Sequence, residues 1–252
     1  MKDIANKEKI EKYIDVGTHK IRALLSDIDS ENTIILESGG GMSSDVYSEI
    51  QDQLAHQNQM RVLSYDRSGF GKSELGPEHF NALDEVNTLY KCLSILNISR
   101  NLILVGHSWG GYLIQLFTQH YPDLVSGLVL IDPMNILFVD RFGLDNMNKL
   151  SPYFENPVTN EEKAGNRMVD HSVESFSFMR GKELPENIPV LLITSGNPPI
   201  PSIWRKCHQD LVSKSKKYLM YIAEGNNHDI VRENPELVIK KVKELIDLLQ
   251  FS

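Results

Sequence analysis

The sequence is poor in cysteine, in basic residues and in long apolar runs, and each shortage excludes a class of protein. Its 252 residues include two cysteines, too few for a disulfide framework and without metal-ligand spacing. No apolar run approaches the roughly 18 residues of a membrane-spanning helix, and the charged first residues hold no apolar signal-peptide core. We therefore expect a cytoplasmic protein with no membrane partner.

Acidic residues outnumber basic ones by 34 to 26, which gives a formal net charge of −8. Nucleic-acid binding requires a basic patch that neutralises phosphates, so we expect no nucleic-acid partner. The hydrophobic content of 41% is ordinary for a soluble globular protein. The length suits one large α/β domain or two small ones.

The stretch from Asn101 to Tyr112 is the most informative part of the sequence. A mostly apolar run leads into Gly106-His107-Ser108-Trp109-Gly110, and apolar residues at helical spacing follow Gly111. The pattern predicts a strand, a sharp turn and a helix, and the turn fits the G-x-S-x-G nucleophile elbow. Such a strained turn crowds the backbone on both sides of the serine, which explains the glycines. The alternative is a glycine-rich turn with a solvated serine.

Strand-like and helix-like segments alternate along most of the chain. The expected strands are residues 12–16, 20–26, 33–37, 60–65, 101–105, 124–131, 189–195 and 218–223. The expected helices are residues 44–58 with Ser44 as N-cap, 81–96, a segment after Gly111, a segment from about 203, and 235–249. This alternation implies a parallel sheet covered on both faces. The loops that follow the strands then share one edge, where ligands bind.

On these motifs the sequence resembles the α/β-hydrolase superfamily, of the serine-hydrolase kind, over nearly its whole length. The resemblance implies a mostly parallel, eight-stranded, doubly wound sheet with helices on both faces. Residues 1–133 and 186–252 form this core domain in the resemblance. Residues 134–185, where the alternation is lost, look like the small helical lid that many members carry. A few surface helices are the alternative for that segment.

The catalytic base is expected to be His228. A serine hydroxyl needs a base near neutral pKa, which favours histidine, and the superfamily's chain order places that histidine late. His208 and His228 are the only histidines in the last quarter of the chain. His228 stands in a turn between the last strand and the last helix, where the family's histidine lies. His208 falls in a helical pattern and is expected at the surface.

The triad acid is expected to be Asp132. Many relatives carry the acid after the next-to-last strand, but the loop from Ser195 to Pro201 contains no carboxylate. Asp132 ends the preceding strand, a position that some α/β-hydrolases use instead. It would hold the imidazole tautomer and stabilise the imidazolium. The alternative for Asp132 is an Asp-Pro turn or a helix cap.

The resemblance also implies an oxyanion hole. One backbone N–H would come from Trp109, after the nucleophile, and the other from Gly40, in the loop after the strand that ends at Glu37. A flexible loop is the alternative for the glycines there. Glu37 itself is a carboxylate at the end of an apolar strand, and burial without a partner is costly. We expect Arg67, at the end of the neighbouring strand, to pair with it.

The predicted function is that of a cofactor-free, metal-free serine hydrolase acting on a small-molecule acyl substrate. Gly71-Lys72-Ser73 resembles the end of a phosphate-binding loop, but Asp66 stands where that loop needs a glycine. An ester or similar acyl bond would be cleaved through an acyl-enzyme. The same site also serves aminopeptidases, lactonases, thioesterases and acyltransferases. An aminopeptidase would need an acidic group for the substrate's amino terminus, and Glu155, Glu161 and Glu174 are available.

A non-catalytic ligand-binding protein that keeps this fold is an alternative from a different class. The sequence carries no signal of an oligomeric state.

Overall fold

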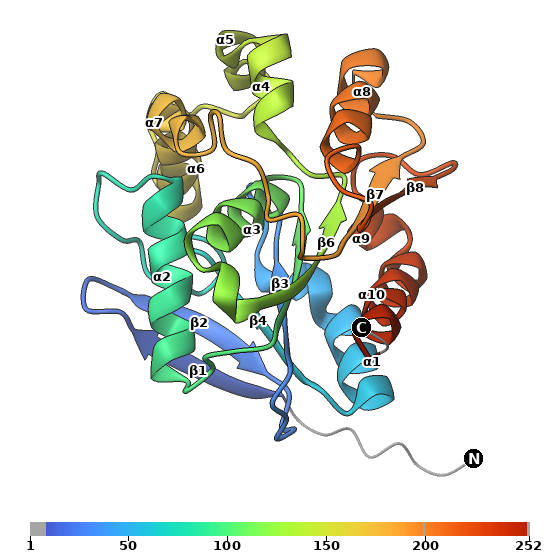
Figure 1. The fold of residues 1–252 in the computed structure, drawn as a ribbon. Coiled ribbons are helices and arrows are strands. Elements are labelled where there is room, and N and C mark those ends of the chain that lie inside the picture. Colours follow the sequence, from blue (N-terminus) through green and yellow to red (C-terminus); the bar gives the residue numbers. More distant parts are fainter. Residues whose placement is uncertain (1–8, 199, 251–252) are drawn as a thin grey trace.

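The computed structural model describes residues 9–198 and 200–250, which form one eight-stranded sheet between layers of helices (Figure 1). The strand order is β1-β2-β4-β3-β5-β6-β7-β8. β2 runs antiparallel to β1 and β4, and all the other neighbouring pairs are parallel. The expected fold class is thereby confirmed. The strands are β1 Ile10–Asp15, β2 Lys20–Leu25, β3 Thr33–Glu37, β4 Arg61–Tyr65, β5 Leu102–His107, β6 Val125–Ile131, β7 Val190–Ser195 and β8 Tyr218–Ala223.

The central strands are apolar on both faces because helices cover both faces of the sheet. Every residue of β3, β5 and β7 is buried. α1 and α10 pack together on one face, and α2, α3 and α8 lie on the other (Figure 1). The helices outside residues 134–185 are η1 Ser44–Tyr47, α1 Ser48–Asn58, α2 Ala82–Ile95, α3 Trp109–His120, η2 Pro122–Leu124, α8 Pro201–Val212, α9 Ile230–Glu233 and α10 Pro235–Gln250.

Residues 134–185, here called the cap segment, hold four short helices between β6 and β7. These are α4 Ile136–Phe142, α5 Leu144–Asn148, α6 Asn160–Asp170 and α7 Ser172–Ser177. In Figure 1 they lie beyond the carboxyl ends of the central strands. The role of the cap segment as a lid stays a prediction.

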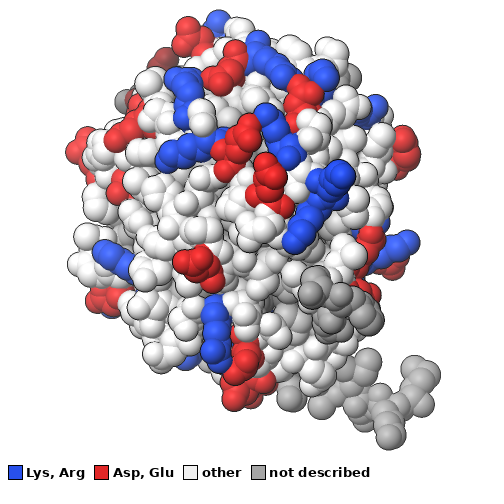
Figure 2. All heavy atoms as spheres, viewed as in Figure 1, with Lys and Arg blue, Asp and Glu red and all other residues white. Residues whose placement is uncertain are grey.

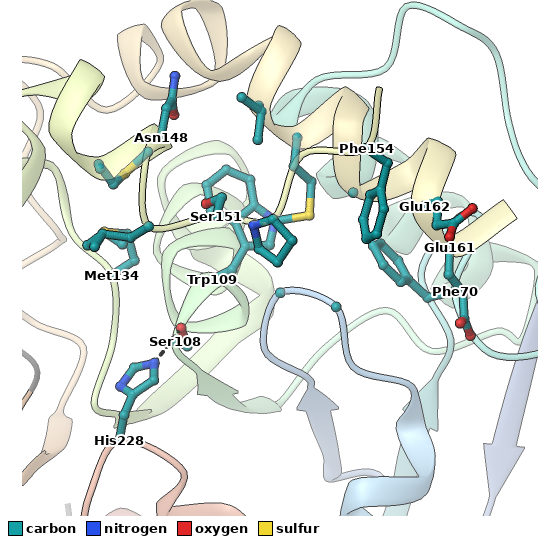
Figure 3. Close-up of a pocket in the computed structure, with 18 of the residues that line it drawn as sticks. Phe70, Ser108, Trp109, Met134, Asn148, Ser151, Phe154, Glu161, Glu162 and His228 are labelled. Carbon is teal, nitrogen blue, oxygen red and sulfur yellow. Dashed lines mark hydrogen bonds between the residues drawn. The ribbon is translucent and has the colours of Figure 1, made fainter. Parts of the chain in front are cut away.

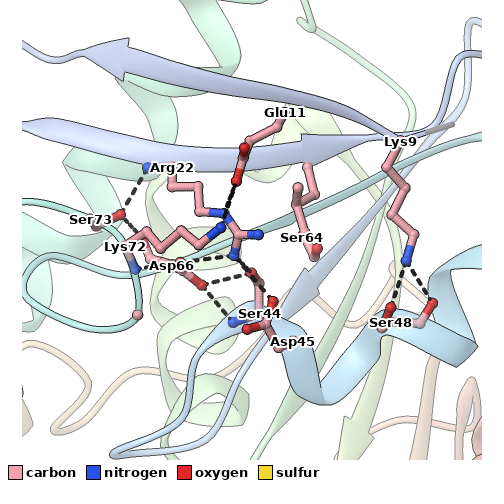
Figure 4. Close-up of polar contacts among 12 residues, drawn as sticks. Lys9, Glu11, Arg22, Ser44, Asp45, Ser48, Ser64, Asp66, Lys72 and Ser73 are labelled. Atoms are coloured by element: carbon pink, nitrogen blue, oxygen red, sulfur yellow. Dashed lines mark hydrogen bonds and ion pairs between the residues drawn. The ribbon is translucent and has the colours of Figure 1, made fainter.

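The helix expected from Ser44 begins differently from the prediction. Residues 44–47 form the 3-10 helix η1, and α1 starts only at Ser48. Ser44 does not cap the helix, because its N–H and its hydroxyl both donate to Oδ1 of Asp66, at 2.7 and 2.6 Å (Figure 4). The other oxygen of Asp66 accepts from the Lys72 N–H at 2.9 Å and from Arg22 at 3.2 Å. Asp66 therefore joins β2, η1 and the loop after β4.

Within the described part of the chain, no helix is both long enough and apolar enough to cross a membrane. On the face seen in Figure 2, the Lys and Arg side chains stand beside Asp and Glu side chains. Charges of both signs are therefore interspersed on this face.

Candidate active site

Ser108 occupies the sharp turn between β5 and α3. Its φ of +52° lies in the left-handed region that residues other than glycine rarely adopt. The turn is held by backbone hydrogen bonds, since the Ser108 N–H donates to the Ile131 carbonyl at 3.0 Å and the Ser108 carbonyl accepts from Met134 at 2.9 Å. A Cβ on Gly106 would lie 2.6 Å from the carbonyl oxygen of Gly110. The glycines of G-x-S-x-G are therefore needed for this close approach.

His228 lies beside Ser108, although 120 residues separate them in the sequence. Nε2 of His228 is 2.8 Å from Oγ of Ser108, and Nδ1 is 2.7 Å from Oδ2 of Asp132 (Figure 3 draws the first of these contacts). His228 comes from the loop between β8 and α9, and its side chain is about one-third exposed. The three residues predicted as nucleophile, base and acid are thus brought together.

His107 supports the loop that carries His228. Its Nε2 donates to the His228 carbonyl at 2.8 Å. Burial, and next the nearby His228, lower the pKa of His107 to about 4. At neutral pH the His107 ring is therefore uncharged and acts as a fixed donor.

Asp132 is fully buried at the end of β6 and also has a positive φ, of +40°. Its Oδ1 accepts from the Ser195 N–H at 2.8 Å and from Trp204 Nε1 at 2.9 Å, and its Oδ2 accepts from the Ser195 hydroxyl at 2.8 Å. Burial raises the pKa of Asp132, but the hydrogen bond with His228, the nearby imidazoles of His208 and His228 and the Ser195 N–H bring it below its ordinary value. The carboxylate is therefore ionised and satisfied by donors.

The expectation that His208 lies at the surface is wrong. Its side chain is fully buried between α8 and the ends of β6 and β7. Nε2 donates to the Pro133 carbonyl at 2.9 Å, Nδ1 is 2.9 Å from the Thr194 hydroxyl, and Oδ1 of Asp132 is 3.9 Å away. Burial lowers the pKa of His208, so the ring is neutral and packs beside Asp132.

Sequence reasoning missed the donors around Asp132. Thr194 and Ser195 end β7, the parallel neighbour of β6, so strand order alone would have placed them next to Asp132. Trp204 carries no such signal, because its position depends on how α8 packs on the sheet.

The loop after β3 is anchored by a buried ion pair. Arg67 lies 2.8 Å from Glu37, as the sequence predicted, and both side chains are almost fully buried. Tyr65 donates a short hydrogen bond to the same carboxylate. Arg67 also donates to the carbonyls of Ser38 and Gly39, the latter at 2.7 Å. The guanidinium therefore fixes the backbone immediately before Gly40.

Gly40 and Trp109, the two predicted oxyanion donors, line one cavity with Ser108 and His228. Trp109 is the first residue of α3, so its N–H has no partner within the helix. A Cβ on Gly40 would lie 3.6 Å from Cβ of Trp109, which shows how closely the two segments approach.

The cavity has a volume of about 850 Å³ and is lined by residues of the core and of the cap segment. In Figure 3, Ser108 and His228 lie at one end, and Phe70, Phe154 and Glu161 lie at the other. Most of the lining is apolar. It includes Met134, Phe138, Met147, Leu150, Met168, Val169, Phe176, Ile200 and Trp204.

A comparison with known proteins identifies the family of this chain. Residues 32–169, more than half of the chain, match the family model described as alpha/beta hydrolase fold. The chain is also similar in structure to E-2-(acetamidomethylene)succinate hydrolase. The TM-score is 0.73 with 18% identity, over 95% of this chain and 100% of that one.

Two curated relatives match the chain in sequence over different shares of its length. An uncharacterized protein of Bacillus subtilis, YqjL, is 22% identical over 82% of this chain and 80% of its own length. A proline iminopeptidase of Lactobacillus helveticus is 28% identical over 60% of this chain and 53% of its own length. The match to the iminopeptidase thus spans about half of that enzyme.

Proposed function

The chain belongs to the α/β-hydrolase fold family, and on that premise we propose that it is a serine hydrolase that cleaves esters of apolar carboxylic acids. The observation that carries this proposal is the unbroken line of two hydrogen bonds from Ser108 through His228 to Asp132. These bonds end at a cavity large enough for a small-molecule substrate.

In the proposed reaction Ser108 attacks the ester carbonyl while Nε2 of His228 takes the hydroxyl proton. The new C–O bond forms as the carbonyl π electrons move onto oxygen. The N–H groups of Trp109 and Gly40 stabilise that oxyanion. His228 then gives its proton to the leaving alcohol, and water hydrolyses the acyl-enzyme by the same route. Asp132 holds His228 in the tautomer that leaves Nε2 free to accept the proton.

The apolar lining supports an apolar acyl group as the part of the substrate that fills the cavity. Each buried methylene contributes roughly 0.8 kcal/mol. Lengthening the acyl chain should therefore raise kcat/KM by about fourfold per methylene until the cavity is full.

A panel of nitrophenyl esters graded by acyl length tests the proposal. The expected result is a rise in kcat/KM from acetate towards medium chains, with Ser108→Ala inactive on all of them. Equal rates for wild type and Ser108→Ala, or no turnover of any ester, would contradict the proposal.

Aminopeptidase activity is the second candidate, because Glu161 and Glu162 line the cavity. Of the three carboxylates expected as candidates, Glu161 alone lines the cavity: Glu155 is not among the lining residues, and Glu174 faces His79. Glu162 already accepts N–H groups of Val158 and Thr159 at 2.7 and 3.0 Å, and Glu161 accepts from Gly71 at 3.3 Å. Both carboxylates therefore already accept hydrogen bonds from the protein. Turnover of aminoacyl nitroanilides faster than that of the matched esters, lost in Glu161→Gln, would favour this candidate.

A further inference from the structure

Three side chains with metal-binding chemistry meet at the seam between the cap segment and the core. His79 comes from the loop before α2, His171 lies between α6 and α7, and Glu174 is in α7. One ligand atom from each lies within 4.8 Å of the other two. Nε2 of His79 is 3.1 Å from Oε2 of Glu174, and the two imidazole centroids are 4.5 Å apart. None of the three lines the cavity at Ser108.

Two imidazoles and one carboxylate are a donor set that binds Zn²⁺ with a fourth position left for water. Zinc–ligand bonds of about 2.0–2.2 Å in a tetrahedron place neighbouring ligand atoms roughly 3.3 Å apart. The His79–Glu174 pair already has this spacing. These two side chains are 64% and 45% exposed, so they are free to rotate the remaining distance and a hydrated ion can reach them.

The backbone on both sides of the cluster is held in place. The Ala82 N–H donates to the Ser175 hydroxyl at 3.0 Å, and the Tyr112 hydroxyl donates to the Ser175 carbonyl at 2.6 Å. On the other side Arg167 of α6 donates to the carbonyls of Gly76 and Pro77, at 3.1 and 2.7 Å. The ligands therefore converge on a framework that need not reorganise when an ion binds, which favours affinity.

We propose that His79, His171 and Glu174 bind one divalent transition-metal ion of the Zn²⁺ type, and that this ion links the cap segment to the core. The ion takes no part in the hydrolytic reaction and does not depend on it. Its structural consequence reaches the cavity through α7, because Phe176, two residues after Glu174, lines the cavity and packs edge-on against Trp109 with centroids 5.5 Å apart. A metal ion at the seam would fix this wall of the cavity.

The test is a titration of the tag-free, chelator-treated full chain with ZnCl₂, followed by calorimetry. We expect one ion per chain. His79→Ala, His171→Ala and Glu174→Gln should each weaken binding by more than about tenfold, since even the loss of an outer-shell partner costs roughly 10–100-fold. His120→Ala, which removes another exposed histidine, is the matched control and should bind as wild type does.

Three results would overturn the site: no binding at micromolar Zn²⁺, binding unchanged in the three ligand variants, or binding that is lost in His228→Ala. The circular dichroism and the metal-free Tm of each variant establish that it is folded, so loss of binding is assigned to the ligand.

The linking role is tested by the melting temperature. Saturating Zn²⁺ should raise the Tm of wild type and should slow protease cleavage within the cap segment, and neither effect should occur in His79→Ala. Wild-type protein that binds the ion with no change in either measurement would refute the link.

Discussion

Arg67 and Glu37 form an ion pair of 2.8 Å whose two side chains are almost completely inaccessible to solvent. The pair joins the ends of β4 and β3, and through the Ser38 and Gly39 carbonyls it holds the loop that leads to Gly40. The buried ion pair therefore positions the loop that carries one of the two proposed oxyanion donors.

Glu37→Gln should destabilise the fold by about 3 kcal/mol in urea unfolding. Removing one partner of a buried pair typically costs about 3–5 kcal/mol, and we expect the lower end because Glu85 still lies 3.3 Å from Arg67. The matched control is Glu31→Gln, which breaks the exposed 2.7 Å pair with Arg100. Exposed ion pairs contribute little to stability. Equal decreases in the free energy of unfolding of the two variants would therefore contradict the stabilising role of the buried pair.

Glu85 should make stability fall as the pH rises. Burial raises the pKa of Glu85 from 4.5 to about 7, although Arg67 lowers it. Between pH 4.5 and 7 the folded state holds a proton on Glu85 that the unfolded state has released. The free energy of unfolding therefore falls as the pH rises from 4.5, and this loss is complete above about pH 7. Glu85→Gln removes the charge and keeps the shape. Its Tm should exceed that of wild type at pH 8 and match it at pH 5.

The comparison of Glu85→Gln with wild type at both pH values isolates this group from all other titrations. A variant that is less stable than wild type at pH 8, and no worse at pH 5, would mean that the folded protein favours the ionised carboxylate.

Gly110→Ala should lower both the Tm and the activity. A Cβ there would press against the backbone oxygens of Ser38 and Glu37, and overpacking of this kind costs about 1–3 kcal/mol. Relief by backbone movement would separate Trp109 from the loop of Gly40. In the control Gly165→Ala, within α6, the nearest atom is 4.0 Å away. That variant should gain about 0.5–1 kcal/mol, and a Tm loss as large as that of Gly110→Ala would refute the steric explanation.

Asp132→Asn should reduce kcat by about 10³–10⁴-fold on the best ester and leave KM nearly unchanged. The amide cannot accept all the hydrogen bonds that the carboxylate takes from Ser195, Trp204 and His228, so the imidazole loses its correct tautomer. Trp204→Phe removes one donor only and should cost less. An Asp132→Asn variant with more than about a tenth of the wild-type kcat would rule out Asp132 as the acid.

The sheet could be predicted from the sequence because its strands are short apolar runs bounded by turn residues. β3 and β8 have the predicted limits, and the elbow at Ser108 has the predicted strand, turn and helix. His228 and Asp132 could be placed near Ser108 because loops at the carboxyl ends of parallel strands share one edge of the sheet.

The rest depends on contacts between distant segments. Burial of His208 follows from the packing of α8 on β7, which its helical pattern does not reveal. The 3-10 turn at Ser44 results from its hydrogen bonds with Asp66. The contact between His79 and His171 forms only once the cap segment folds over the core. The helices of the cap segment could not be placed, because the sequence there shows no strand–helix alternation.

The most direct measurement of the central claim is the mass of the intact protein after reaction with a fluorophosphonate. An activated Ser108 hydroxyl should displace fluoride and add one phosphonyl group per chain, located by peptide mapping at Ser108. Ser108→Ala should remain unmodified, and His228→Ala should react far more slowly. Folded wild-type protein that gains no adduct, or gains it at another residue, would contradict the proposed nucleophile and leave a ligand-binding protein with this fold.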